Sequence, residues 1–122
     1  PALAHRIAGA ADLFLMPSRF EPSGRNLFIS LRYGAVPVAR AVGGLADTVR
    51  DYDPRTGEGN GFAFSEYNSM ALFNAVQRGL ELYKDREGWS RLRRSGMEED
   101  HSWAASARGY EKLYREIAAL RA

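Results

Sequence analysis

A short apolar run that closes with a proline, DLFLMPS at residues 12–18, most constrains what this chain can fold into. The run is unbroken rather than alternating, which is typical of a strand buried on both faces in a parallel sheet. A second strand is predicted for VPVAR at 36–40, after a stretch that Gly34 ends suitably as a helix. Parallel neighbours need a crossover connection, and a helix supplies one. This part of the chain therefore predicts a strand–helix–strand unit.

The rest of the chain continues this alternation of elements. A third strand is predicted for GFAF at 61–64, after a polar loop rich in Gly, Pro, Asn and Asp at 53–61. Helices are predicted near residues 2–9, 24–34, 44–49, 69–85, 86–100 and 102–122. The helix at 69–85 has the clearest apolar spacing, whereas the pattern at 86–100 indicates a more broken one. Ser102 is placed to cap the last helix.

The fold class that follows is α/β, with three parallel strands, flanking helices and a helical C-terminus. Three strands are half of the usual six-stranded doubly wound, Rossmann-like sheet. We interpret residues 1–122 as a single domain. The chain starts in mid-pattern without a methionine, so we expect it to be cut from something longer.

Apolar stripes on the C-terminal helices indicate buried faces. We expect the aromatic residues of these helices to pack in the core. The stripes consist of Leu72, Val76, Leu80 and Tyr83 on one helix and of Tyr110, Leu113, Ile117 and Leu120 on the last.

Composition excludes several classes of function. A net charge of +2, with acids interleaved among the bases, gives no reason to expect a nucleic-acid partner. The chain has no cysteine, and its two histidines, His5 and His101, belong to no metal-ligand spacing, so we expect no metal site. It has no long apolar run, so we expect no membrane association. Without a recognisable targeting segment, we expect a cytoplasmic protein.

The turn after the first strand, SRFEPSGRN, is the first candidate binding site. A turn at the carboxyl end of a buried parallel strand is where open α/β sheets bind ligands, because the next helix presents unpaired N–H groups. Gly24 lets backbone approach a phosphate, Ser23 and Asn26 cap or donate, and Arg25 adds positive charge. The alternative is that this turn caps a helix and binds nothing.

A second glycine turn, AVGGLADTV, follows the second strand. Gly43 and Gly44 permit a tight turn, and we expect it at the same edge of the sheet as Glu21. Two such turns facing one crevice favour a ligand site. The alternative is that paired glycines merely start a helix close against the sheet.

Four segments together resemble a known family. They are ADLFLMPSRFEPSG, LRYGAVPVARAVGGLADTVRDYD, GNGFAF and DHSWAASARGYEKLY, which cover most of the chain in this order. The sequence is similar to the C-terminal portion of bacterial glycogen synthases and plant starch synthases, retaining glycosyltransferases of the two-domain B fold. The resemblance implies the nucleotide-binding domain, with ADP-glucose or ADP as donor ligand and an α-1,4-glucan as acceptor. It implies no other cofactor.

Residue roles follow from the same resemblance. Glu21 matches the carboxylate that contacts the donor glucose and is the one catalytic candidate. Gly24 matches the diphosphate cradle, and Gly43 and Gly44 match the glycines that line the crevice. The Arg and Lys that neutralise the leaving diphosphate in the family precede the segment matched here.

The sequence departs from the family pattern inside the matched site. The family has other residues, in order Cys, Leu, Gln, Tyr and Thr, where this chain has Ser23, Arg25, Leu27, Ile29 and Val42. We interpret these changes as gathered around the donor pocket. The hypothesis that follows is little or no synthase activity for the chain alone.

Two alternatives to an active enzyme remain open. One is an engineered or isolated structural half-domain without catalysis, in which the exposed strand edge at 12–18 pairs antiparallel with a second copy and rebuilds six strands. The other is a weak ADP-binding remnant, because backbone amides at Gly24 and Gly43 do not depend on side chains.

Overall fold

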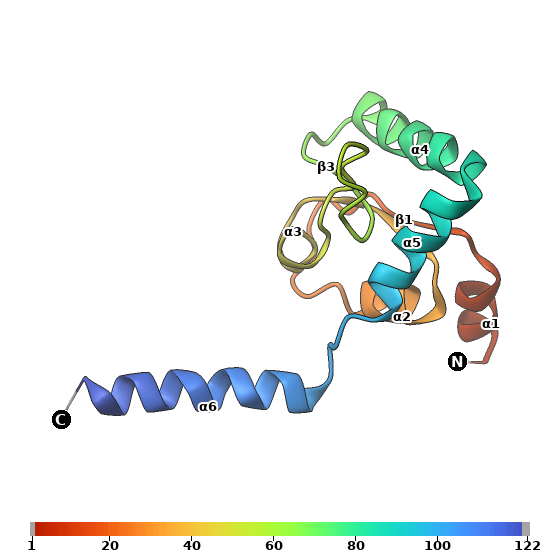
Figure 1. The fold of residues 1–122 in the computed structure, drawn as a ribbon. Helices are drawn as coiled ribbons and strands as arrows, with labels where there is room; N and C mark the ends of the chain where they lie inside the picture. The colour runs from red at the N-terminus through yellow and green to blue at the C-terminus, as the bar shows by residue number, and fades with distance from the viewer. Residues whose placement is uncertain (1, 121–122) are drawn as a thin grey trace.

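The computed structural model describes residues 2–120 and contains one parallel sheet of three strands in the order β1-β2-β3. The strands are β1 (Leu13–Met16), β2 (Val36–Arg40) and β3 (Phe62–Phe64). The helices are α1 (Ala2–Ala10), α2 (Arg25–Tyr33), α3 (Gly44–Thr48), α4 (Ser69–Lys84), α5 (Arg86–Met97) and α6 (Trp103–Ala119). Figure 1 shows this succession along the chain. The predicted half of a doubly wound domain is confirmed.

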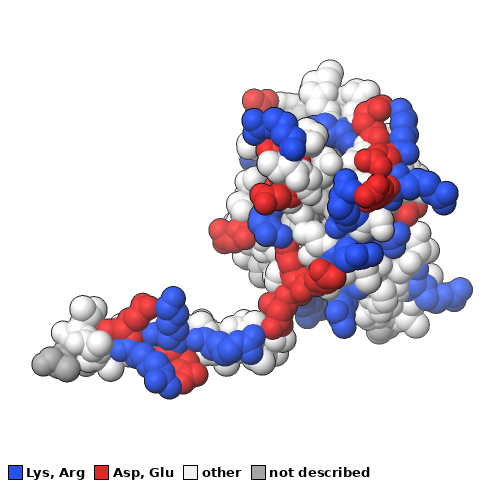
Figure 2. All heavy atoms as spheres, in the orientation of Figure 1, with Lys and Arg blue, Asp and Glu red and all other residues white. Residues whose placement is uncertain are grey.

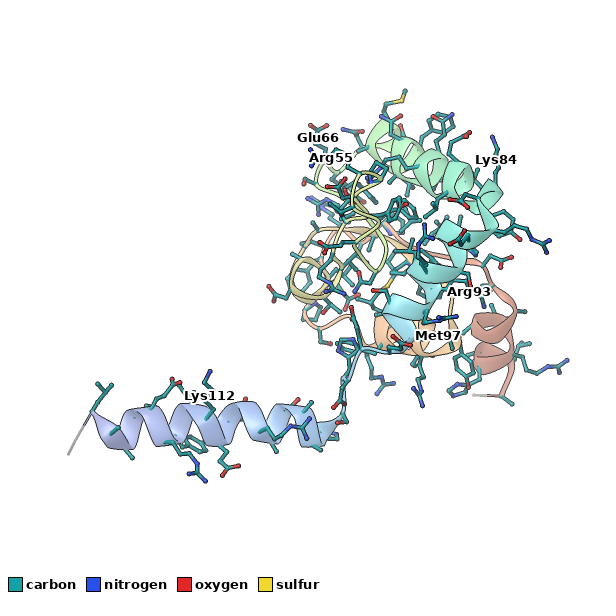
Figure 3. The ribbon with its side chains drawn as sticks, viewed as in Figure 1. Arg55, Glu66, Lys84, Arg93, Met97 and Lys112 are labelled. Carbon is teal, nitrogen blue, oxygen red and sulfur yellow. The ribbon has the colours of Figure 1, made fainter. Side chains whose placement is uncertain are left out.

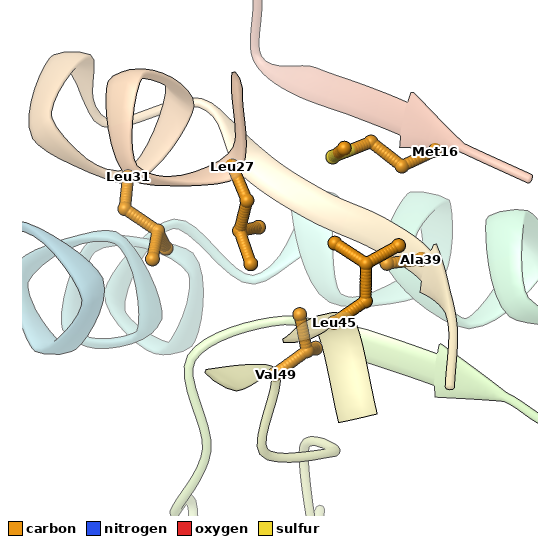
Figure 4. Packing of buried hydrophobic residues seen from close by; sticks show 6 residues of the cluster. All are labelled: Met16, Leu27, Leu31, Ala39, Leu45 and Val49. Atoms are coloured by element: carbon orange, nitrogen blue, oxygen red, sulfur yellow. The ribbon is translucent and has the colours of Figure 1, made fainter. Parts of the chain in front are cut away.

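Successive residues of each strand point to opposite sides of the sheet, so both faces carry apolar side chains. Helices cover both faces. On one face, α2 and α3 pack through Leu27, Leu31 and Leu45 against Met16 and Ala39 (Figure 4). The other face is covered by α4 and α5, whose buried side chains contact β2 and β3. That second cluster consists of Val36, Val38, Phe62, Ala75, Trp89 and Leu92.

Local signals in the sequence explain where the helices begin and end. Gly34 adopts the left-handed conformation at φ 77° and ends α2, as predicted. The Asp85 side chain accepts hydrogen bonds from the amides of Glu87 and Gly88 and starts α5. α5 runs without a break to Met97, where the sequence predicted a more broken helix. Arg93 of α5 donates from Nε to the Gly34 carbonyl at 2.9 Å and joins α5 to the end of α2 (Figure 3).

The expectation that the first strand is buried on both faces is wrong at Leu15. This residue is 50% exposed. β1 is an edge strand in the described part of the chain, where β2 is its sole partner. One backbone edge of β1 is therefore unpaired within residues 2–120, and the Leu15 side chain lies on a face of the sheet that is only partly covered there.

The last helix corrects the expectation of core packing. α6 extends away from the sheet and its covering helices (Figure 1), and none of its residues is buried. The predicted stripe forms, and the Ser102 hydroxyl accepts from the Ala105 amide at 3.2 Å, which confirms the predicted cap. The aromatic residues at 103, 110 and 114, like Phe73 and Tyr83 of α4, are also exposed. The apolar spacing identified a face of α6 that nothing in the described chain covers.

Candidate active site at the carboxyl edge of the sheet

The two glycine turns meet where β1 and β2 end, as the sequence predicted. A Cβ atom on Gly43 would lie 1.9 Å from the carbonyl oxygen of Glu21. A Cβ atom on Gly44 would lie 2.6 Å from the carbonyl oxygen of Ser23. Both distances are far below van der Waals contact, so the two backbones pack this closely because the glycines have no side chains. Glu21, Ser23, Gly43 and Gly44 therefore form one continuous surface.

Glu21 is held by its own turn. Its Oε1 accepts a hydrogen bond from the Gly24 amide at 2.9 Å, and the residue is half-buried. Gly24 is in the left-handed region at φ 71°, and a Cβ atom there would meet Leu45 Cδ2 at 2.7 Å. This bond fixes one carboxylate oxygen at the start of α2, and within residues 2–120 the other, Oε2, has no hydrogen-bond partner.

The start of α2 presents backbone donors to the same surface. Its first backbone hydrogen bond runs from the Leu27 amide to the Gly24 carbonyl at 2.8 Å, so the amides of Arg25 and Asn26 precede the first closed turn. The side chains of Ser23, Arg25 and Asn26 are exposed. Positive charge and unpaired amides at a helix N-terminus favour an anionic group.

The interpretation that all the departures from the family pattern gather around the donor pocket is wrong for Leu27. This residue is 0% exposed and packs in the core below the turn (Figure 4). Ile29 is half-buried on the same helix. Ser23 and Arg25, in contrast, face solvent beside Gly24. The changed residues therefore divide between the core and the candidate site.

Arg40, the last residue of β2, was not singled out from the sequence, yet it joins the loops around the site. Its Nη1 donates to the carbonyl oxygens of Arg19 at 3.2 Å and Ser18 at 3.4 Å, and its Nε donates to that of Ser65 at 3.0 Å. The sequence feature that could have identified Arg40 is its single charge between an apolar strand and a glycine turn.

The remaining surface offers less for chemistry. A hollow of about 600 Å³ runs along α6 beside Trp103, Tyr110 and Tyr114, but it is formed by one helix and lies away from the two turns. Acidic and basic side chains are interspersed on the face shown in Figure 2 and along α6. Within residues 2–120, no three His, Cys, Asp or Glu side chains group as metal ligands. No helix there is both long and apolar enough to cross a bilayer.

Comparisons with known proteins agree on one family. The family model described as glycosyl transferases group 1 matches residues 3–95. The glycogen synthase of Anaeromyxobacter sp. (strain K) is 60% identical over 116 residues, which cover 95% of this chain and 24% of the relative. The glycogen synthase of Koribacter versatilis (strain Ellin345) is 48% identical over 121 residues, 99% of this chain and 25% of the relative. This chain thus spans about a quarter of the length of these relatives.

Solved structures agree with these sequence matches. The catalytic domain of starch synthase IV from Arabidopsis thaliana, bound to ADP and acarbose, superimposes with a TM-score of 0.84 at 43% identity, over 95% of this chain and 24% of that one. Sucrose-phosphate synthase from Thermosynechococcus elongatus superimposes with a TM-score of 0.58 at 28% identity, over 93% of this chain and 27% of that one. The fold of this chain is thus shared with parts of a starch synthase and of a sucrose-phosphate synthase.

Proposed function

The chain belongs to the glycosyl transferases of group 1, and on that premise we propose that it forms the donor-binding part of a glycogen or starch synthase. In this function the donor is ADP-glucose and the acceptor is the non-reducing end of an α-1,4-glucan. The support is the identity of 48–60% to glycogen synthases and the close superposition on a starch synthase domain that was solved with ADP and acarbose.

The single observation that carries the proposal is the contact between the turns of Glu21 and Gly43. It brings a carboxylate, backbone donors and a glycine-lined surface to one edge of the sheet. In the proposed reaction, Glu21 contacts the donor glucose and stabilises positive charge that develops at the anomeric carbon. The hydrogen bond from Gly24 leaves Oε2 available for this role.

In this proposal, backbone amides and the Arg25 guanidinium bind the diphosphate of the donor. The amides of Arg25 and Asn26 lie at the positive end of the α2 dipole, whereas the Gly24 amide is already bonded to Glu21 Oε1. The Arg25 guanidinium forms no ion pair with any described residue, so its charge is available to an incoming anion. Ser23 and Asn26 supply exposed polar groups beside it. The Gly43–Gly44 turn closes the opposite side of the surface.

A chimeric enzyme tests the proposal. The segment of the Anaeromyxobacter sp. (strain K) glycogen synthase that matches this chain is replaced by the chain, and transfer of labelled glucose from ADP-glucose to glycogen is measured. We expect the chimera to transfer glucose and Glu21→Gln to lower kcat by about 100-fold or more. Glu58→Gln is the matched control, because Glu58 is an exposed carboxylate in the 53–61 loop. We expect no transfer by the chain alone.

Three results would contradict the proposal. They are a folded chimera without transfer, a Glu21→Gln variant as active as Glu58→Gln, and transfer by the isolated chain. Circular dichroism and gel filtration establish beforehand that each chimera is folded.

A second candidate function, self-association, is favoured by the exposure of Leu15. β1 leaves one edge unpaired within the described chain, and an exposed apolar edge strand is a template for another strand. We propose that two isolated copies pair antiparallel along residues 12–18. A two-fold arrangement of this kind would form one six-stranded sheet.

Sedimentation equilibrium with and without millimolar ADP tests self-association. We expect the chain to be a dimer whose association does not change with ADP, and Leu15→Lys to be a monomer, because a charge on the edge opposes strand pairing. Leu80→Lys, a change at an equally exposed position on α4, is the control. A monomeric wild-type chain, or dimers of both variants, would rule out this edge as the interface.

We further propose that the protein works in the cytoplasm. Its 122 residues include no cysteine, so the fold needs no oxidising compartment. Fractionation of cells that produce the tagged protein checks this location, and recovery outside the cytoplasmic fraction would contradict it.

A further inference from the structure

Arg40 occupies the centre of the carboxyl edge. It ends the middle strand of the sheet, so the loops that follow β1 and β3 lie on either side of it. The residue is half-buried and directs its donors to both neighbours. Nη1 reaches the carbonyls of Ser18 and Arg19 after β1, and Nε reaches the carbonyl of Ser65 after β3. One side chain thus bridges the exits of both flanking strands.

The same guanidinium also contacts an aromatic ring. Its central carbon lies 5.3 Å from the ring centroid of Tyr67, within the range of a cation–π interaction. A guanidinium is planar and presents its donors in a rigid fork, so the positions of its partners are fixed relative to one another. Tyr67 and Ser65 anchor it on one side of β2, and Ser18 and Arg19 accept from it on the other.

We propose that Arg40 is a positioning residue of the site, which fixes the loop that carries Glu21. This inference rests on the proposed synthase function. Arg40 holds the loop two and three residues before Glu21, and the backbone of Gly43 packs against the Glu21 carbonyl. The start of the loop and its catalytic residue are therefore both attached to the segment that leaves β2.

The hydrogen bonds favour positioning over a purely electrostatic role for Arg40. Within residues 2–120 it has no carboxylate partner, and its identified bonds all go to backbone carbonyls. A residue that only balanced charge would be replaced adequately by lysine. A residue that holds two loops through a fork would not be, because lysine has one flexible ammonium group.

Hydrogen–deuterium exchange of the purified chain tests the positioning directly. We expect Arg40→Gln and Arg40→Lys each to speed exchange of the Gly24 amide, which donates to Glu21 Oε1, by about tenfold, with α5 unchanged. Arg78→Gln is the matched control, because Arg78 donates to the Ala63 carbonyl and pairs with Asp51 away from the Glu21 loop. Protection of α5 in every variant reports that the fold is intact. Unchanged exchange of the Gly24 amide would overturn the inference.

Kinetics in the chimera separate positioning from binding of the donor. We expect Arg40→Lys to lower kcat by about 100-fold, with a change of less than about threefold in KM for ADP-glucose, because small displacements of a reacting group cost rate. Arg78→Gln should keep the kcat of the unaltered chimera. A Lys variant with unaltered kcat, or one changed in KM alone, would overturn the inference. If the unaltered chimera makes no glucan, the proposed function fails, and the exchange measurement still decides whether Arg40 positions the loop.

Discussion

The backbone of Gly43 lies so close to the carbonyl oxygen of Glu21 that position 43 has no room for a side chain. A Cβ atom on Gly43 would lie 1.9 Å from that oxygen. Gly43 also has φ 50° and ψ −137°, a conformation that residues with side chains rarely adopt. The geometry of the candidate site therefore depends on a residue whose only chemical contribution is the absence of a side chain.

Gly43→Ala should destabilise the chain and displace Glu21. We expect a loss of at least about 2 kcal/mol in the free energy of unfolding, because the added methyl collides with backbone that cannot rotate away. Gly57→Ala is the control: Gly57 has φ 76°, but a Cβ atom there meets nothing within 4 Å. Its cost should be about 1 kcal/mol, from backbone strain alone. Urea unfolding measures both losses, and equal losses would contradict the collision.

Asn60→Asp should lower the free energy of unfolding at neutral pH. Asn60 is 1% exposed, and its Nδ2 donates to the Thr48 carbonyl at 2.9 Å and to Glu99 Oε1 at 2.9 Å. Asn60→Asp replaces this donor with a carboxylate oxygen facing two acceptors. We expect a loss of about 3 kcal/mol in the free energy of unfolding.

The loss caused by Asn60→Asp should shrink as pH falls from about 7 to about 5. Burial beside Glu99 raises the pKa of the new carboxyl in the folded state, so protonation stabilises the folded variant relative to the wild-type chain. Asn74→Asp is the control, since Asn74 is exposed on α4 and its side chain makes no hydrogen bond with any described residue. A deficit for Asn60→Asp that is constant with pH would contradict this account.

The convergence of the two turns could be predicted from the sequence. Two apolar runs followed by glycine turns must place those turns at one edge if the strands are parallel. Glu21 and Gly43 therefore had to lie near each other, whatever the details of the helices between them. Their backbone contact could not be predicted, because it depends on the φ and ψ angles that each glycine adopts.

Leu27 and α6 show where sequence reasoning stops. The motif identified Leu27 as a departure from the family pattern. Leu27 lies three residues after Gly24, and this position in α2 directs its side chain into the core rather than the crevice. The stripe on α6 was predicted correctly, since periodicity shows which side chains share a face. It does not show what covers that face. Arg40 was missed because a single charge at a strand end does not reveal which carbonyls it reaches.

Asp100 should titrate below its ordinary value of 3.8. Hydrogen bonds from Ser102 lower its pKa most, and Arg108 contributes less. Because the pKa is lowered in the folded state, the stabilisation is present above 3.8 and is lost as pH falls through the folded-state value. Carboxyl chemical shifts measured by NMR give the midpoint. Ser102→Ala should raise it toward 3.8 by more than Arg108→Gln does, and the reverse order would contradict the assignment of the main cause to Ser102.

The two tryptophans should report separately on the core and on α6. Trp89 is 5% exposed and packs edge-on against Tyr83, with ring centroids 5.1 Å apart, whereas Trp103 is 89% exposed. We expect iodide to quench a red-shifted component of the fluorescence that Trp103→Phe removes, and Trp89→Phe to leave that component in place.

Protein concentration provides the control for the Trp103 signal. Pairing along residues 12–18 involves β1 and leaves α6 free, so quenching of Trp103 should not change between the dilute and the associated chain. If quenching falls as the chain associates, α6 is buried by the second copy and β1 is not the sole interface. If iodide fails to quench Trp103 even in the dilute chain, α6 packs against the sheet-containing part in solution and does not extend from it.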